Sequence, residues 1–77
     1  MKLKINWGHR RAKHAIERMW LRGISLQEVE TAIKEGKRIF QRETGLIKSL
    51  YSHFEVVFDE KRFGDIKKIY PVTIKVK

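Results

Sequence analysis

The chain has 77 residues and no cysteine, which excludes disulfide bonds and thiolate metal sites. Its 18 lysine and arginine residues against 9 acidic residues give a net charge of +9, an excess that favours nucleic acid, an anionic membrane surface or an acidic protein as partner. Because no apolar run approaches the length of a membrane span and no signal peptide is found, we expect one small cytoplasmic domain over residues 1–77 that does not enter a membrane.

The first third of the chain predicts a strand followed by a helix. Met1–Asn6 alternates apolar residues with lysines, as a short edge strand does. A helix should run from His9 to Leu21, and Gly23 supplies the left-handed residue that commonly ends a helix. The expected core-facing stripe of this helix occupies one sector of its surface and consists of Ala12, Ile16, Met19 and Trp20.

A second helix is predicted from Leu26 to Glu35. Ser25 has the character of an N-cap, and Glu28 follows it at the spacing of a capping box. Gly36 should end this helix, which makes the two helices a helical hairpin. We expect its buried side chains to be Leu26, Val29 and Ile33.

From residue 37 onward the apolar period becomes two, which predicts strands. The first strand should span Arg38–Arg42, with a turn at 43–45. Residues 46–58 are long for one strand, so we expect a break within 49–53. The predicted apolar face of this region consists of Leu46, Leu50, Phe54, Val56 and Phe58, and its mainly polar face of Ser49, Tyr51, His53 and Glu55.

The last third predicts a turn over 59–65 and a final strand from Ile66 to Lys77. Pro71 has no N–H to donate, so it indicates an edge, a bulge or a bend. Uninterrupted alternation would place Tyr70 and Ile74 on the core face and Thr73 and Lys75 on the other. The predicted fold is therefore α+β, with two N-terminal helices packed on an antiparallel sheet of three to four strands. Its free face would carry Thr73, Lys75, Lys77, His53 and Glu55.

Basic and titratable residues gather beside the apolar stripe of the first helix. Arg11, His14, Arg18 and Arg22 lie within about 80° of one another. Histidine can transfer protons and arginine can hold a phosphate in bidentate fashion, so His14 and Arg18 resemble the working parts of a metal-independent nuclease. The alternative is that His14 is an ordinary surface residue and that Arg18 pairs with Glu17 or another carboxylate.

Other kinds of site receive less support. His53 and Glu55 could supply an acid or base, or form an ordinary cross-strand polar pair. His9, His14 and His53 match no known zinc spacing, so we predict no metal and no cofactor. The acidic residues of the second helix would face DNA phosphates badly, which argues against duplex readout by that helix. Trp7 and Trp20 are interpreted as core or interface anchors.

The helical block resembles a known family of small domains. The segment from His14 to Ser25, with Arg18-Met19 and Arg22-Gly23-Ile24 within it, followed by Val29, Ala32-Ile33 and Gly36, is similar to the domain-of-unknown-function family 4258. That family looks like a relative of RelE-type and BrnT-type toxins of toxin–antitoxin systems. The resemblance implies two helices on an antiparallel sheet, metal-free cleavage of RNA, and silencing by an antitoxin encoded next to the toxin.

The sequence thus predicts a toxin-like protein that cuts or binds RNA and is held by an acidic antitoxin. His14 and Arg18 are the predicted catalytic residues. The predicted nucleic-acid-binding residues are Arg11, Arg22, Thr73 and Lys75. A chain this short buries only about 60% of its unfolded surface, so a homodimer or a tightly bound partner would add to its stability. The alternative function is a non-enzymatic basic module that binds an acidic protein partner.

Overall fold

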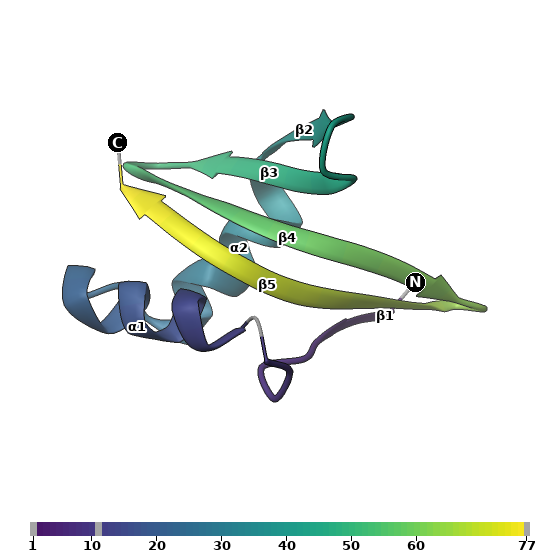
Figure 1. The fold of residues 1–77 in the computed structure, drawn as a ribbon, viewed down its shortest axis with the longest axis horizontal. Coiled ribbons are helices and arrows are strands. Elements are labelled where there is room, and N and C mark those ends of the chain that lie inside the picture. The colour runs from purple at the N-terminus through teal and green to yellow at the C-terminus, as the bar shows by residue number, and fades with distance from the viewer. Residues whose placement is uncertain (1, 11, 77) are drawn as a thin grey trace.

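Two helices and five strands make up the part of the chain that the computed structural model describes, residues 2–10 and 12–76. In chain order they are β1 (Lys2–Ile5), α1 (Ala12–Arg22), α2 (Leu26–Glu35), β2 (Lys37–Gln41), β3 (Leu46–Tyr51), β4 (Phe54–Phe63) and β5 (Ile66–Val76). The strands form one sheet in the order β1-β5-β4-β3-β2 (Figure 1). The α+β class is confirmed, but the sheet has five strands and is mixed, because β1 runs parallel to β5.

α1 begins three residues later than predicted and ends one residue later, at Arg22. His9 lies in a turn, in which its carbonyl accepts the Ala12 N–H at 3.1 Å, and the helix starts at Ala12. Gly23 follows the helix with φ +67°, and the Ile24 N–H donates to the Met19 carbonyl at 2.9 Å. This is the hydrogen bond of a Schellman cap, so the role predicted for Gly23 is confirmed.

α2 has the predicted bounds and the predicted N-cap. The Ser25 hydroxyl accepts the Glu28 N–H at 3.1 Å, and the Glu28 carboxylate accepts the Ser25 N–H at 3.2 Å, which completes the capping box. Val29 and Ile33 are buried as expected. The prediction for Leu26 is wrong, because its side chain is 52% exposed.

The end of α2 is fastened to β3. The buried Ser49 hydroxyl donates to the Ala32 carbonyl, and Gly36 lies where a Cβ atom would collide with both of those groups. A side chain at position 36 would therefore push the helix off the sheet. Ser49 was predicted on a polar face, but it points into the core, where the helix carbonyl satisfies its hydroxyl.

Both helices pack on one face of the sheet, which carries Phe54, Val56 and Phe58. The buried line of α1 is Ala12, Ala15 and Met19, about 50° around the helix from the predicted stripe. Trp20 was predicted to be in the core and is 79% exposed. The small residues Ala12 and Ala15 bring the helix close to β5, and the bulky side chains of Trp20 and Leu21 point outward.

The break predicted within residues 49–53 is confirmed. Ser52 and His53 form a two-residue turn in which Ser52 has φ +54°, so Tyr51 pairs directly with Phe54. This pairing joins an odd position to an even one. As a result Leu46 and Leu50 lie on the face opposite to Phe54, and the single apolar face predicted for 46–58 is wrong.

The predicted turn over 59–65 is much shorter in the structure. β4 continues to Phe63, and β4 and β5 meet at a turn of Gly64 and Asp65. Figure 1 shows this long hairpin reaching past the ends of β2 and β3. The first predicted strand, 38–42, is shifted by one residue relative to β2.

β5 contains a bulge beside Pro71. Val57 pairs with Thr73 but Phe58 pairs with Pro71, so Val72 is an extra residue. The bulge predicted for Pro71 is therefore confirmed. An edge is present at this position as well, because β1 pairs only with residues 66–69 of β5, so that among the described residues Pro71 has a paired strand, β4, on one side only. The core residues of β5 are Ile69, Pro71 and Ile74, and Tyr70, predicted in the core, points to the other face.

The two neighbours Met19 and Trp20 should differ sharply in their effect on stability. Met19→Ala removes a buried side chain and should lower the free energy of unfolding by about 2–5 kcal/mol, whereas Trp20→Ala should change it by no more than about 0.5 kcal/mol. Urea unfolding followed by circular dichroism measures both values. The opposite order would mean that α1 is rotated about its axis relative to this structure.

Candidate functional site

α1 carries the residues predicted to act on RNA along one flank. His14, Arg18 and Arg22 follow one another at intervals of four residues, so their side chains are neighbours on the helix. All three are exposed. Among the described residues, none of the three side chains has a hydrogen bond or an ion pair, and Arg18 has none with Glu17. The fourth residue of the predicted set, Arg11, lies outside the described residues.

The other predicted residues lie on a different surface. Thr73 and Lys75 extend from β5 on the face of the sheet opposite to the core, because Thr73 pairs with Val57 and Lys75 with Glu55. We call this the helix-free face; its polar residues include Lys4, Lys48, Glu55, Asp59, Lys61, Lys68, Tyr70, Thr73 and Lys75. α1 packs on the core side of β5, so the predicted residues form two groups rather than one site.

One carboxylate, Glu55, lies between Lys75 and Lys48 on the helix-free face. It is the direct cross-strand partner of Lys75 and also forms an ion pair with Lys48 at 3.5 Å. His53 does not share a strand face with Glu55 as predicted, because it belongs to the turn before β4. Its Nδ1 atom lies 3.3 Å from the Ser52 hydroxyl. His53 and Glu55 are therefore not assembled as an acid–base pair.

Three lysines that the sequence pattern did not single out form a row on the helix-free face. Lys4 is the in-register partner of Lys68 on β1 and β5, and Lys68 is the partner of Lys61 on β4. Sequence periodicity could not find this row, because it depends on the parallel pairing of the first strand with the last. To predict the row, one would have to know that β1 lies beside β5 in the sheet.

Tyr70 and His9 also meet beside this row. Their rings pack edge to face, with centroids 5.3 Å apart, and the His9 Nε2 atom is buried without a hydrogen-bond partner in the described part of the chain. Periodicity placed Tyr70 on the wrong face because the bulge at Val72 reverses the alternation of β5. Pro71 was the signal that could have indicated this reversal.

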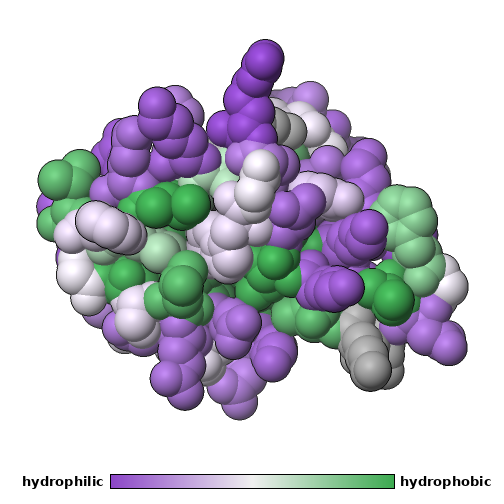
Figure 2. Space-filling model, turned by 90° about the horizontal axis from the view of Figure 1, so that it is seen from below, coloured by the Kyte–Doolittle hydropathy of each residue, from purple (hydrophilic) through white to green (hydrophobic). Residues whose placement is uncertain are grey.

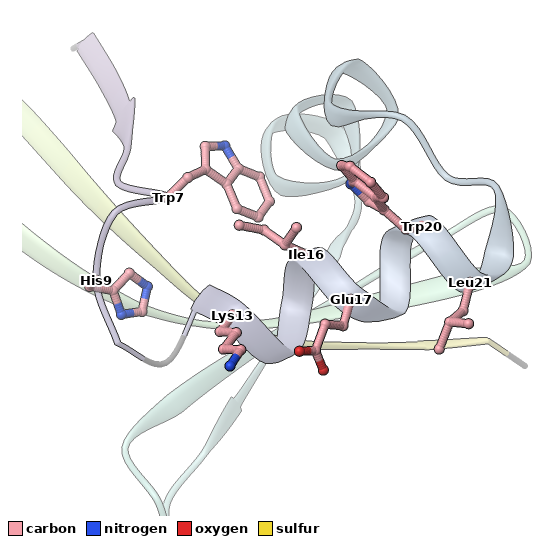
Figure 3. A pocket seen from close by; sticks show the side chains of 7 residues that line it. All are labelled: Trp7, His9, Lys13, Ile16, Glu17, Trp20 and Leu21. Carbon is pink, nitrogen blue, oxygen red and sulfur yellow. The ribbon is translucent and has the colours of Figure 1, made fainter.

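A groove of about 640 Å³ runs along the outer side of α1. Figure 3 shows Trp7, Ile16 and Trp20 along one side of the helix, with Lys13, Glu17 and Leu21 extending from the other and His9 at one end. Trp20 and Leu21 are 79% and 80% exposed. In Figure 2 green and pale side chains break the purple surface at the end of the molecule where α1 lies. Exposed apolar side chains grouped together are a common feature of contact sites.

The three histidines lie in different surroundings in the described part of the chain. Within residues 2–10 and 12–76, no three histidine, aspartate or glutamate side chains come together as a metal site requires. His9 lies beside Tyr70, His14 on the flank of α1 and His53 in a turn. What the described surface offers is uncompensated positive charge on α1 and on the helix-free face, and an apolar groove on α1.

Neither described helix is long and apolar enough to cross a membrane. No curated protein and no solved structure matches the chain. The model of the family described as "Domain of unknown function (DUF4258)" matches residues 12–71, which run from the start of α1 to Pro71 in β5. This match covers most of the chain, and the chain therefore belongs to the DUF4258 family.

Proposed function

We propose that this protein is a toxin-like RNA-binding protein of the cytoplasm that cleaves RNA without a metal ion. The observation that carries the proposal is the flank of α1, where His14, Arg18 and Arg22 stand exposed without a carboxylate partner among the described residues. Like charges four residues apart destabilise a helix by a few tenths of a kcal/mol per pair. A polyanion bound to the flank would remove that repulsion.

The chemistry assigns a separate task to each group. In metal-free cleavage the RNA 2′-oxygen attacks the adjacent phosphorus while the bond to the 5′-oxygen breaks, so one proton leaves the 2′-hydroxyl and one reaches the departing oxygen. His14 serves one of these two transfers as base or acid, and solvent water, which reaches this exposed flank, serves the other. Arg18 and Arg22 hold the phosphate and stabilise its additional negative charge. Thr73 and Lys75 contact a more distant part of the RNA from the helix-free face.

Replacing His14 should abolish cleavage without weakening RNA binding. In His14→Ala the rate of RNA cleavage in EDTA should fall by about 10²–10⁴-fold, the usual contribution of a general acid or base. His53→Ala is the matched control, because it removes an exposed histidine from the turn between β3 and β4, and it should cleave like the wild type. Equal rates for the two variants, or no cleavage by the wild type, would refute the catalytic role.

Replacing Arg18 should weaken the binding of RNA itself. Arg18→Ala removes a phosphate contact, and we expect the dissociation constant for RNA to rise about tenfold, or about 1.4 kcal/mol. Arg42→Ala, which removes an exposed arginine from the turn after β2, should leave it unchanged. Fluorescence anisotropy with labelled RNA at fixed salt measures both. A shift of the same size in both variants would show only a general effect of charge.

A second candidate function is that of a non-enzymatic module that binds an acidic protein, as an antitoxin would be. The groove on α1 favours it, because Trp20 and Leu21 present an apolar surface beside the uncompensated basic flank. An amphipathic helix with acidic residues beside its apolar stripe would match both features. Under this function the groove supplies the affinity and the flank selects an acidic partner.

This second function predicts that Trp20 anchors the partner. Trp20→Ser should reduce binding to the product of an acidic reading frame encoded beside this one by about 2 kcal/mol or more, as loss of an interface anchor does. Phe40→Ser is the control, because Phe40 is also exposed, at 64%, but lies on β2 away from the groove. Calorimetry on the purified pair would decide, and equal affinities for the two variants would exclude the groove as the binding site.

A further inference from the structure

The lysine row formed by Lys4, Lys68 and Lys61 sets charges of one sign side by side across three strands. Each pair is in register, so the Cα atoms are separated by about one strand spacing of 4.8 Å. Like charges directly opposite one another destabilise a sheet. Elsewhere on the same face, opposite charges are neighbours: Lys75 is opposite Glu55, and Lys48 forms an ion pair with Glu55.

Carboxylates of the described chain relieve little of this repulsion. Asp59 lies 3.8 Å from the Lys61 ammonium, and this is the row's one ion pair within residues 2–10 and 12–76. The Lys68 ammonium lies over the Phe63 ring, 5.1 Å from its centroid, a contact that leaves its charge uncompensated. Lys4 has no ion pair within the described ranges. Two of the three positive charges therefore lack a counter-charge from the described residues.

A small cavity of about 270 Å³ lies at the end of the row. Lys4 and Lys68 line it together with Ile5 and Asn6. The Asn6 side-chain oxygen accepts the Gly8 N–H at 2.9 Å, which leaves the amide nitrogen, a donor, directed away from that bond. The polar side chains of the cavity thus carry two ammonium groups and an amide N–H₂ as donors, and the one amide oxygen already accepts a backbone N–H. Such a set suits an anion.

Aromatic side chains beside the row indicate which anion it suits. Phe63 is 55% exposed at the tip of the β4–β5 hairpin, and Tyr70 lies two residues from Lys68 on the same face of β5. Lysine binds phosphate as a point charge, and an exposed aromatic ring can stack an unpaired base. A nucleobase would stack on the ring next to its own phosphate, a combination of contacts that a carboxylate side chain does not offer.

We propose that the cavity between Lys4 and Lys68 binds a backbone phosphate of single-stranded RNA, with the neighbouring base on Phe63. The site is separate from the flank of α1, although its choice of RNA over other phosphates rests on the proposed function. It gives the protein a second contact with the RNA, at the end of the sheet where β1 pairs with β5. Its role is binding, and cleavage chemistry stays with His14.

The salt dependence of RNA binding tests the site. For a single strand, the slope of log K against log salt changes by about 0.7 for each phosphate that the protein neutralises, so Lys4→Gln and Lys68→Gln should each reduce the slope by about that amount. Lys34→Gln, which removes an exposed lysine from α2, should keep the wild-type slope. Circular dichroism melts verify that each variant is folded. Slopes equal to that of the control would overturn the proposal.

A second measurement separates this proposal from the proposed function. Inorganic pyrophosphate is titrated into the wild-type protein at constant ionic strength while NMR follows the amides of residues 4–6 and 68. Saturable shifts there that disappear in Lys68→Gln support the phosphate site even if the protein binds no RNA; that result would refute the proposed function and the choice of RNA as the ligand, but not the phosphate site. Shifts absent with pyrophosphate, or produced equally by polyglutamate, would overturn the phosphate site.

Discussion

The extra residue in β5 determines what each face of the sheet carries. Val72 shifts the pairing with β4 by one position, so that Ile69 and Ile74, an odd and an even residue, both enter the core. A regular strand would have to expose one of them. The same shift turns Lys68 and Tyr70 to the helix-free face. Core packing and the charged surface therefore depend on one irregularity, which Pro71 favours because it has no N–H for the ladder.

α1 shows a complementary division of side-chain sizes. Ala12 and Ala15 are buried, which lets the helix backbone lie close to β5, and Met19 fills the remaining space. Trp20 is then directed outward together with the basic flank. An apolar surface and a basic flank without a carboxylate partner among the described residues thus share one helix. This combination is more typical of a surface that meets a partner than of one that only faces water.

Local signals in the sequence were sufficient to predict the two helices. They were insufficient to predict the face of the sheet on which each strand residue lies. The capping box at Ser25 and the left-handed Gly23 are short-range features, and both appear in the structure as predicted. The face of each strand residue depends on pairing. Tyr70 and Leu50 were misplaced because a bulge and a two-residue turn each reverse the alternation. The Lys4–Lys68 pair could not be predicted, since it joins residues from opposite ends of the chain.

The pairing of β1 with β5 also bears on how the chain folds. Lys2 is in register with Ile66, so this contact closes a loop that contains nearly the whole described chain. Contacts between residues so far apart in sequence slow folding, because the entropy of closing the loop is lost before the contact forms. The helical hairpin and the β2–β3–β4 meander consist of local contacts and should form first. Until β1 docks, the outer edge of β5 is open to pairing with another chain, which makes this edge the point at which misfolding would begin.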